Sequence, residues 1–429
     1  MNTVLVVDTE RRPLDPIHPG RARVLLTHGK AAVLRRYPFT IVLVAEGPPS
    51  SPEPLRLKID PSSRITGLAL INDRTGVVAW AAELSHHGHA IRDALTARRS
   101  IRRGRRSRKT RHRKPRCLNR RRVKGWLPPS LESRIANVLT WVGRMRQLAP
   151  VGAISMELVR FDTQMLENAE ISGVAYQQGE LRGYEVKQYL LDKWGRRCAY
   201  CGSVGVPMQV EHIVPKVRGG SDRVSNLTLA CGPCNNRKGA RTAAQFGFPL
   251  IQAQARYSLR DLAAVNATRW VLHRRLCLLG LPVETGTGGR TKWNRTARQL
   301  PKAHWVDAAC VGASTPRRIA VDGARPLLIR AVGHGSRRMC GTDRFGFPIR
   351  HRLRAKRSLG MQTGDIVRVV QPRGKYTGVH VGRVTIRHKP KFHVDGHDFH
   401  PSTMTVLQRA DGYDYATGEV LTVSATPCP

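Results

Sequence analysis

Residues 198–201 read CAYC, and residues 209–239 read QVEHIVPKVRGGSDRVSNLTLACGPCNNRKG. Two C-x-x-C pairs at this separation can supply four thiolates to one tetrahedral zinc ion. The chain has nine cysteines, an odd count, and four of them fall in these two pairs, a pattern that suits metal binding in a reducing compartment better than a disulfide framework. The sequence therefore predicts a structural Zn²⁺ site, with a plain zinc ribbon as the alternative. The four expected ligands are Cys198, Cys201, Cys231 and Cys234.

Glu211 and His212 lie between the two cysteine pairs, where a plain zinc ribbon has no reason to carry them. Phosphodiester hydrolysis needs an activated water and a cation on the scissile phosphate. VEHIVP, the Gly-Gly loop, SNL and CNN together resemble the HNH nuclease motif, a β-hairpin and a helix folded around one divalent metal ion. The resemblance implies that His212 is the general base, that Glu211 and Asn236 bind Mg²⁺, and that Asn226 orients the histidine or its loop. Asn235 is the alternative to Asn236, and a structural histidine is the alternative for His212.

The composition predicts a polyanionic partner. Lys and Arg number 73 against 30 Asp and Glu, which gives a formal net charge of +43 and a pI near 11.3. Nucleic acid is the simplest explanation, because each phosphate contact releases counterions. No segment approaches the ~20 apolar residues of a membrane span, and the N-terminus does not resemble a secretory signal. We therefore expect a cytoplasmic protein without a membrane partner, associated with the nucleoid when bound to DNA.

The N-terminal sequence predicts a small basic α+β module over 1–54. VLVVD (4–8) and FTIVLVAE (39–46) are apolar runs typical of strands, and RARVLLTHGKAAVLRR (21–36) predicts a short helix between them. LRLKIDPSSRITGLALIND (55–73) alternates, turns and continues as a second β-rich run, which predicts a hairpin.

A second set of acids follows apolar strands. Asp60 ends one predicted strand, Glu157 ends another (AISMEL), and His304 stands three residues before Asp307 in AHWVDAACVG. Taken singly, each acid is more often a cap or turn residue. Their order resembles that of the RNase H-like RuvC nuclease fold, where the acids converge to hold two metal ions about a scissile phosphate. The resemblance implies that Asp60, Glu157 and Asp307 bind Mg²⁺ and that all four residues are catalytic.

A basic run occupies residues 98–124, between the first two acids, with sixteen Lys or Arg and no acid. Like charges at i, i+4 repel, so we expect the free segment to be a poor helix and a phosphate backbone to stabilise it. A nucleic-acid-bridging helix is the prediction, and a disordered basic linker is the alternative. The residues expected to contact nucleic acid are Arg98, Arg99, Arg102, Arg103, Arg105, Arg106, Arg108, Lys109 and Arg111.

These parts, in this order, make the chain similar to the IscB family of transposon-encoded RNA-guided DNA endonucleases. IscB in turn resembles an ancestor of the CRISPR effectors that combine HNH and RuvC domains. The similarity covers nearly the whole chain, including the connector YQQGELRGYEVKQYLLDKWGRRCAYCG. PLDP at 13–16 stands where the family has PLMP, and GTDRFGFP (341–348) with 364–384 resembles the region that reads a motif beside the target.

The resemblance implies an α/β multidomain protein. A split RNase H-like (RuvC) domain carries an inserted zinc-stapled ββα HNH domain, an arginine-rich bridge helix, an N-terminal α+β module and a C-terminal β-rich domain. The implied segments are 1–54 (PLMP-like module), 55–90 (RuvC I), 91–125 (bridge helix), 126–170 (RuvC II), 171–255 (linker and HNH), 256–335 (RuvC III) and 336–429 (target-adjacent-motif-interacting domain).

The resemblance also implies a metal-dependent, RNA-guided DNA endonuclease that works as a protein monomer in a ribonucleoprotein. A guide RNA (omega RNA) pairs with one strand of a double-stranded DNA target; the HNH site cuts that strand and the RuvC site cuts the displaced strand. The implied cofactors are Mg²⁺ at both sites and structural Zn²⁺. A guide-independent HNH homing or restriction-type endonuclease is the first alternative, but it leaves the second acid set unexplained. An RNA-binding or regulatory protein with decayed sites is the second, and the intact candidate residues disfavour it.

Overall fold

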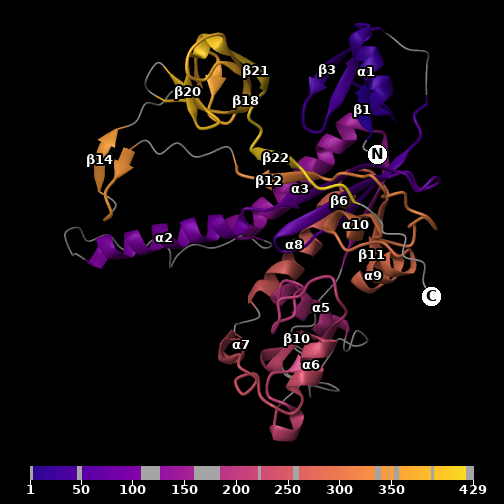
Figure 1. Cartoon of the computed structure of the whole chain (residues 1–429), viewed down its shortest axis with the longest axis vertical. Coiled ribbons are helices and arrows are strands. Elements are labelled where there is room, and N and C mark those ends of the chain that lie inside the picture. The colour runs from indigo at the N-terminus through magenta and orange to yellow at the C-terminus, as the bar shows by residue number, and fades with distance from the viewer. Residues whose placement is uncertain are drawn as a thin grey trace. The chain divides into compact units, whose positions relative to one another are not determined.

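A computed structural model of the chain describes residues 3–45, 51–107, 126–158, 184–220, 224–254, 260–333, 340–345, 347–351, 357–387 and 391–421 (Figure 1). The chain divides into two compact units. The first comprises Met1–Glu53, Ala82–Pro150 and Gly323–Val420, and the second comprises Pro54–Ala81, Val151–Asp322 and Leu421–Pro429. Among the described residues, no helix is long and apolar enough to cross a membrane.

The second unit contains a β-sheet in which some neighbouring strands are parallel and others are antiparallel. β5 (Leu55–Asp60) and β6 (Ile65–Ile71) form the predicted antiparallel hairpin. β8 (Val151–Glu157) pairs in parallel with β5 on one side and with β11 (Val283–Gly286) on the other. β5 and β6 are almost entirely buried, as expected for strands covered on both faces. In the first unit, β12 (Leu327–Ala331) pairs in parallel with the Ala82–Ser85 part of β7 (Val78–Ser85) and antiparallel with β22 (Tyr413–Thr417).

Helix α10 (His304–Ala309) lies directly against β6 (Figure 1). A Cβ atom added at Gly67 of β6 would collide with the backbone carbonyl of His304, so only glycine permits this approach. The buried side chain of Lys58 donates from Nζ to the carbonyl of Val311 at 2.8 Å, just past the other end of α10. α10 is thereby fixed against β5 and β6 near both of its ends. The two other helices of this region are α8 (Arg260–Cys277) and α9 (Gly288–Ala297).

A smaller module within the second unit has a ββα arrangement. β9 (Met208–His212) and β10 (Leu227–Cys231) pair antiparallel, with Cys231 opposite Met208, and α6 (Gly232–Lys238) follows at once. Its own apolar core includes Leu190, Tyr200, Leu229 and Ile251. The remaining elements are α5 (Tyr184–Lys193), η2 (Lys216–Arg218), η3 (Val224–Asn226) and α7 (Pro249–Gln254).

Backbone conformation and close packing explain why two glycines, Gly219 and Gly220, stand together in this module. Gly219 adopts a φ of 83°, in the left-handed region that favours glycine. A Cβ atom on Gly220 would collide with the carbonyl of Val214. Asn226 bonds to the same residue, accepting from Val214 N and donating to Val214 O, both at 2.9 Å. The loop after His212 is therefore held by Asn226, and the orienting role of Asn226 in the chemistry stays a prediction.

The first unit begins with the predicted α+β module, whose core includes Val4, Val6, Ala22 and Ile41. The helix expected over 21–36 is wrong in extent. It ends at Thr27, Gly29 takes a φ of 66°, and the apolar AAVLR continues as a strand. The sheet order is β2-β1-β4-β3. The elements are β1 (Val4–Val7), β2 (Pro13–Ile17), α1 (Pro19–Thr27), β3 (Ala31–Arg35) and β4 (Thr40–Leu43).

The rest of the first unit holds two long helices and a C-terminal antiparallel sheet of order β20-β19-β18-β17-β21, packed around Val367, Val384 and Phe392. Burial alternates within the strand Phe392–Val394, where Phe392 and Val394 are buried and His393 between them is half-buried. The helices are α2 (Gly88–Ser107) and α3 (Pro129–Leu148). The smaller elements are β13 (Cys340–Thr342), β14 (Pro348–His351), β15 (Arg357–Ser358), β16 (Met361–Gln362), β17 (Ile366–Gln371), β18 (Gly378–Thr385), β19 (Phe392–Val394), β20 (His397–Phe399), η4 (Pro401–Thr403) and β21 (Met404–Gln408).

Candidate functional site

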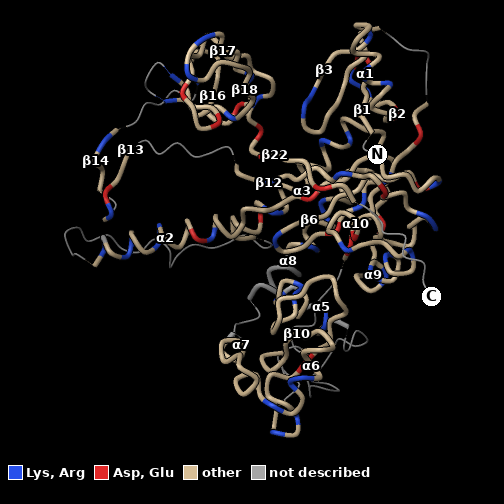
Figure 2. The backbone as a smooth tube through the Cα atoms, in the orientation of Figure 1, with Lys and Arg blue, Asp and Glu red and all other residues tan. Residues whose placement is uncertain are grey.

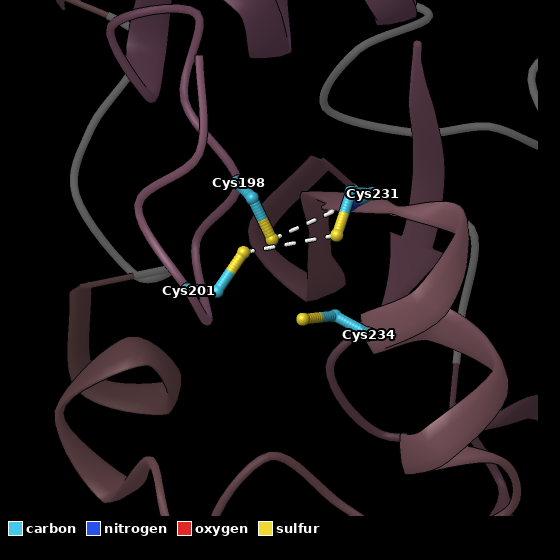
Figure 3. Close-up of side chains that lie close together, drawn as sticks. All are labelled: Cys198, Cys201, Cys231 and Cys234. Carbon is cyan, nitrogen blue, oxygen red and sulfur yellow. Dashed lines mark hydrogen bonds between the residues drawn. The ribbon is translucent and has the colours of Figure 1, made fainter. Parts of the chain in front are cut away.

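The four predicted zinc ligands converge in the ββα module (Figure 3). Cys198 and Cys201 lie in the turn before β9, Cys231 ends β10, and Cys234 lies in the first turn of α6. The four Sγ atoms all lie within 4.8 Å of one another. A bond from Ser203 lowers the pKa of the Cys201 thiol to about 6, whereas burial raises that of Cys234 to about 12. The donor set fits a zinc ion, which would hold all four sulfurs as thiolates and staple the hairpin to the helix.

Glu211 faces the interior of the module. Its carboxylate is 6% exposed; Oε2 accepts from the Tyr200 hydroxyl at 2.7 Å, and Oε1 accepts from Lys238 Nζ at 2.5 Å. The Lys238 side chain is fully buried, and its Nζ also donates to the backbone carbonyl of His212 at 2.8 Å. Glu211 is thus half of a buried ion pair. A divalent ion on this carboxylate would have to displace Tyr200 or Lys238.

α6 turns two of its side chains toward β9, three residues apart in the sequence. Lys238 bonds to Glu211, and Asn235 Nδ2 donates to Gln209 Oε1 at 2.7 Å. Residues three apart share a helix face, and the residue next to one of them points elsewhere. Asn236 is accordingly exposed. The structure places Asn235, the alternative, against the strand that carries Glu211, and the ligand role of either asparagine stays a prediction.

The second set of acids also comes together. Asp60, Glu157 and Asp307 are 3%, 4% and 6% exposed. Ile59 lies opposite Met156 in the parallel pair β5–β8, so Asp60 and Glu157 end adjacent strands. The close approach of α10 to β6 brings Asp307 to the same region, because Gly67 is the β6 partner of Asp60.

The electrostatics confirm that these acids are neighbours. Burial raises the pKa of Glu157 to about 8, and the charges of Asp60 and Asp307 act in the same direction. Their oxygen atoms do not form a set as tight as the cysteines, since within the described residues only the cysteine group has three or more ligand atoms within 4.8 Å of one another. Carboxylate oxygens are nevertheless the ligands that Mg²⁺ prefers, and the donor set fits that ion. His304 lies one helical turn before Asp307 and is half-buried.

Arginines surround the acids, and sequence reasoning missed all of them. Arg295 Nη1 lies 2.9 Å from Asp307 Oδ1, Arg196 Nη1 lies 3.8 Å from Asp307 Oδ2, and Arg269 Nη2 lies 3.4 Å from Glu157 Oε1. In a chain with 73 basic residues, nothing in the sequence marks these three as partners of the buried acids.

Part of the predicted basic segment is helical. α2 extends to Ser107 and its arginines are visible along the tube in Figure 2. Arg98, Arg99, Arg102, Arg103 and Arg106 are exposed. The Arg105 side chain lies outside the described part of the structure, as do residues 108–125, which include Arg108, Lys109 and Arg111. Five guanidinium groups on one exposed helix form a suitable surface for a phosphate backbone.

Two family models match the chain. Residues 4–179 match the model described as RRXRR protein, and residues 102–106 read RRGRR. Residues 198–241 match the HNH endonuclease model, which confirms the HNH prediction made from the cysteine–histidine–asparagine cluster. No curated protein matches the chain.

The similar solved structures include two Cas9 proteins. The Cas9 of Streptococcus thermophilus in complex with the AGAA PAM is 14% identical over 60% of this chain and 32% of its own, with a TM-score of 0.22. The Type II-C Cas9 enzyme from Actinomyces naeslundii is 20% identical over 43% of this chain and 32% of its own, with a TM-score of 0.16. This chain spans about a third of the length of these proteins.

Proposed function

From the premise that this chain contains an HNH endonuclease domain at 198–241 and is a nuclease, we propose that it is an RNA-guided DNA endonuclease of the IscB kind with two cutting centres. The observation that carries the proposal is the gathering of Asp60, Glu157 and Asp307 in a buried cluster outside the HNH domain. A guide-independent HNH enzyme has no need of this second group of acids.

In the HNH domain, His212 acts as the general base on the attacking water. A neutral imidazole nitrogen accepts the proton, the water oxygen bonds to phosphorus, and the oxygen of the neighbouring nucleotide leaves. The backbone at His212 is held by Lys238 on one side and by the Asn226-braced loop on the other. HNH domains depend on a metal ion, and in this domain the zinc of the cysteine cluster has a structural role only.

The acid cluster is the RuvC-type centre. Mg²⁺ bound there would activate water and stabilise the leaving oxygen. Asp60, Glu157 and Asp307 would hold the cations, and His304, one helical turn before Asp307, is assigned to the same centre. Arg295 must release Asp307 Oδ1 for this, because its Nη1 lies 2.9 Å from that oxygen.

The positive charge of the chain supports nucleic acids as its partners. The net charge of +43 and the exposed arginines of α2 support simultaneous contact with an omega-type guide RNA and a double-stranded DNA target. The guide-paired strand is assigned to the HNH centre and the displaced strand to the RuvC-type centre. We place the ribonucleoprotein, with one protein chain, in the cytoplasm and on the nucleoid.

Purification with bound RNA tests the proposal. A defined structured RNA should co-purify, and with a matched target and Mg²⁺ both DNA strands should be cut. His212→Ala should spare the guide-paired strand only, and Asp60→Ala should spare the displaced strand only. Absence of bound RNA together with cutting of free duplex would establish the guide-independent HNH endonuclease instead. If neither strand is cut in the complete complex, the proposal of two RNA-guided cutting centres is wrong.

A further inference from the structure

Arg269, in the middle of α8, is buried beside the acid cluster and is 2% exposed. We propose that Arg269 is a positioning residue for this cluster, holding the turn after Asp60 and the carboxylate of Glu157 in the geometry that receives cations. The inference rests on the proposed function of the cluster as a second cutting centre.

The guanidinium group of Arg269 joins the ends of two neighbouring strands. Its Nε and Nη2 both donate to the carbonyl of Pro61, at 3.1 and 2.8 Å, and Pro61 directly follows Asp60 at the end of β5. The same Nη2 reaches Glu157 Oε1 at 3.4 Å, at the end of β8. A planar guanidinium presents these N–H groups in a fixed fork, so the two strand ends are tied at a defined separation.

The Arg269 geometry leaves Glu157 able to bind a cation. The two shorter bonds of Arg269 go to a neutral carbonyl, and its contact with the carboxylate is long. Arg295 differs, because it bonds directly to Asp307 Oδ1 at 2.9 Å and so competes with any ion there. Arg269 can therefore stay in place when a cation binds to the acid cluster, whereas the bond from Arg295 to Asp307 cannot.

The test uses the complete ribonucleoprotein with matched target, each DNA strand carrying its own label. Arg269→Met should slow displaced-strand cutting by at least about tenfold, because small misplacements of reacting groups have large effects on rate. It should also raise the Mg²⁺ concentration for half-maximal cutting of that strand and leave guide-paired-strand cutting unchanged. Arg274→Gln is the matched control, since Arg274 is exposed on the same helix, and it should change neither strand.

Arg269→Lys keeps the positive charge but lacks the planar set of guanidinium N–H donors. If Arg269→Met does not fold, the lysine variant provides the test of the positioning role. It should cut the guide-paired strand normally and need more Mg²⁺ for the other. Direct binding of Mn²⁺, followed by electron paramagnetic resonance, should weaken in the same variant, with Asp60→Ala defining the signal that does not come from the cluster. Amide exchange in β5 and β8 should stay as in the parent protein, which a purely structural role would not allow.

Two results would overturn the inference: wild-type Mg²⁺ dependence in Arg269→Lys, or equal loss of both cuts. The Asp60→Ala variant separately tests the proposal that the acid cluster is a cutting centre. If Asp60→Ala still cuts the displaced strand, the cluster is not a cutting centre at all. If Asp60→Ala abolishes that cut and both Arg269 variants retain it, only the role of Arg269 is wrong.

Discussion

Lys238→Met should destabilise the HNH hairpin strongly while leaving the rest of the chain folded. The Lys238 and Glu211 side chains are 0% and 6% exposed and lie 2.5 Å apart, so water screens their interaction very little. Removing one partner of a buried ion pair leaves an uncompensated charge and costs about 3–5 kcal/mol. The substitution also removes the bond to the His212 carbonyl.

Hydrogen–deuterium exchange of the β9 and β10 amides measures this loss locally, which suits a multidomain chain without a single unfolding transition. The expected loss corresponds to exchange faster by roughly 100- to 5,000-fold. Lys216→Met, a change at an exposed lysine of the same module, should leave exchange unchanged. Wild-type protection of β9 in Lys238→Met would refute the ion-pair argument.

The double variant Glu211→Gln with Lys238→Met separates structure from chemistry. Two neutral side chains replace the pair, so much of the lost protection should return. If guide-paired-strand cutting returns as well, Glu211 is a structural residue. If protection returns without cutting, the Glu211 carboxylate takes part in the chemistry, as a metal ligand would.

Three further predictions concern the two centres. Cys234→Ser should reduce the zinc content, measured with a chromogenic chelator, from about one ion per chain to none. It should also abolish cutting of the guide-paired strand and leave cutting of the displaced strand unchanged. Zinc retained by the variant would contradict a structural zinc site at the four cysteines. Gly67→Ala should displace α10 through the His304 carbonyl and slow displaced-strand cutting by roughly 100-fold, whereas Gly143→Ala, with nothing within 4 Å of the added Cβ, should have no effect. Because the pKa of Glu157 is raised to about 8 by burial, its carboxyl is protonated below that pH and cannot bind a cation. At subsaturating Mg²⁺, displaced-strand cutting should therefore fall faster than guide-paired-strand cutting from about pH 8.5 to about pH 6.5, and a pH-independent ratio of the two would disprove this.

Local patterns in the sequence predicted the cysteine cluster and the β5–β6 hairpin, because spacing and alternation determine both. The gathering of Asp60, Glu157 and Asp307 was predicted only through the order of acids in a known family, since no local pattern brings such distant residues together.

Other features depend on tertiary packing or on helical phase. The choice between Asn235 and Asn236 depends on which residue of α6 faces β9, and a shift of one residue reverses it. The burial of Lys238 and Arg269 has no sequence signal, because each becomes stable only through acceptors supplied by another segment. The helix expected over 21–36 is shorter because the left-handed Gly29 ends it, and a glycine within an apolar run does not by itself reveal its φ.

The parallel pairing of β8 with β11 has a consequence for how this protein could have arisen. Adjacent parallel strands need a crossover, and α8 alone is long enough to make one. The whole HNH module is therefore additional length within a connection that the sheet already requires. Closing a loop grows in cost only with the logarithm of its length, about 0.6 kcal/mol per doubling. A connection of this kind can gain, lose or exchange a complete domain at little expense to the sheet, which makes it a natural point for recombination.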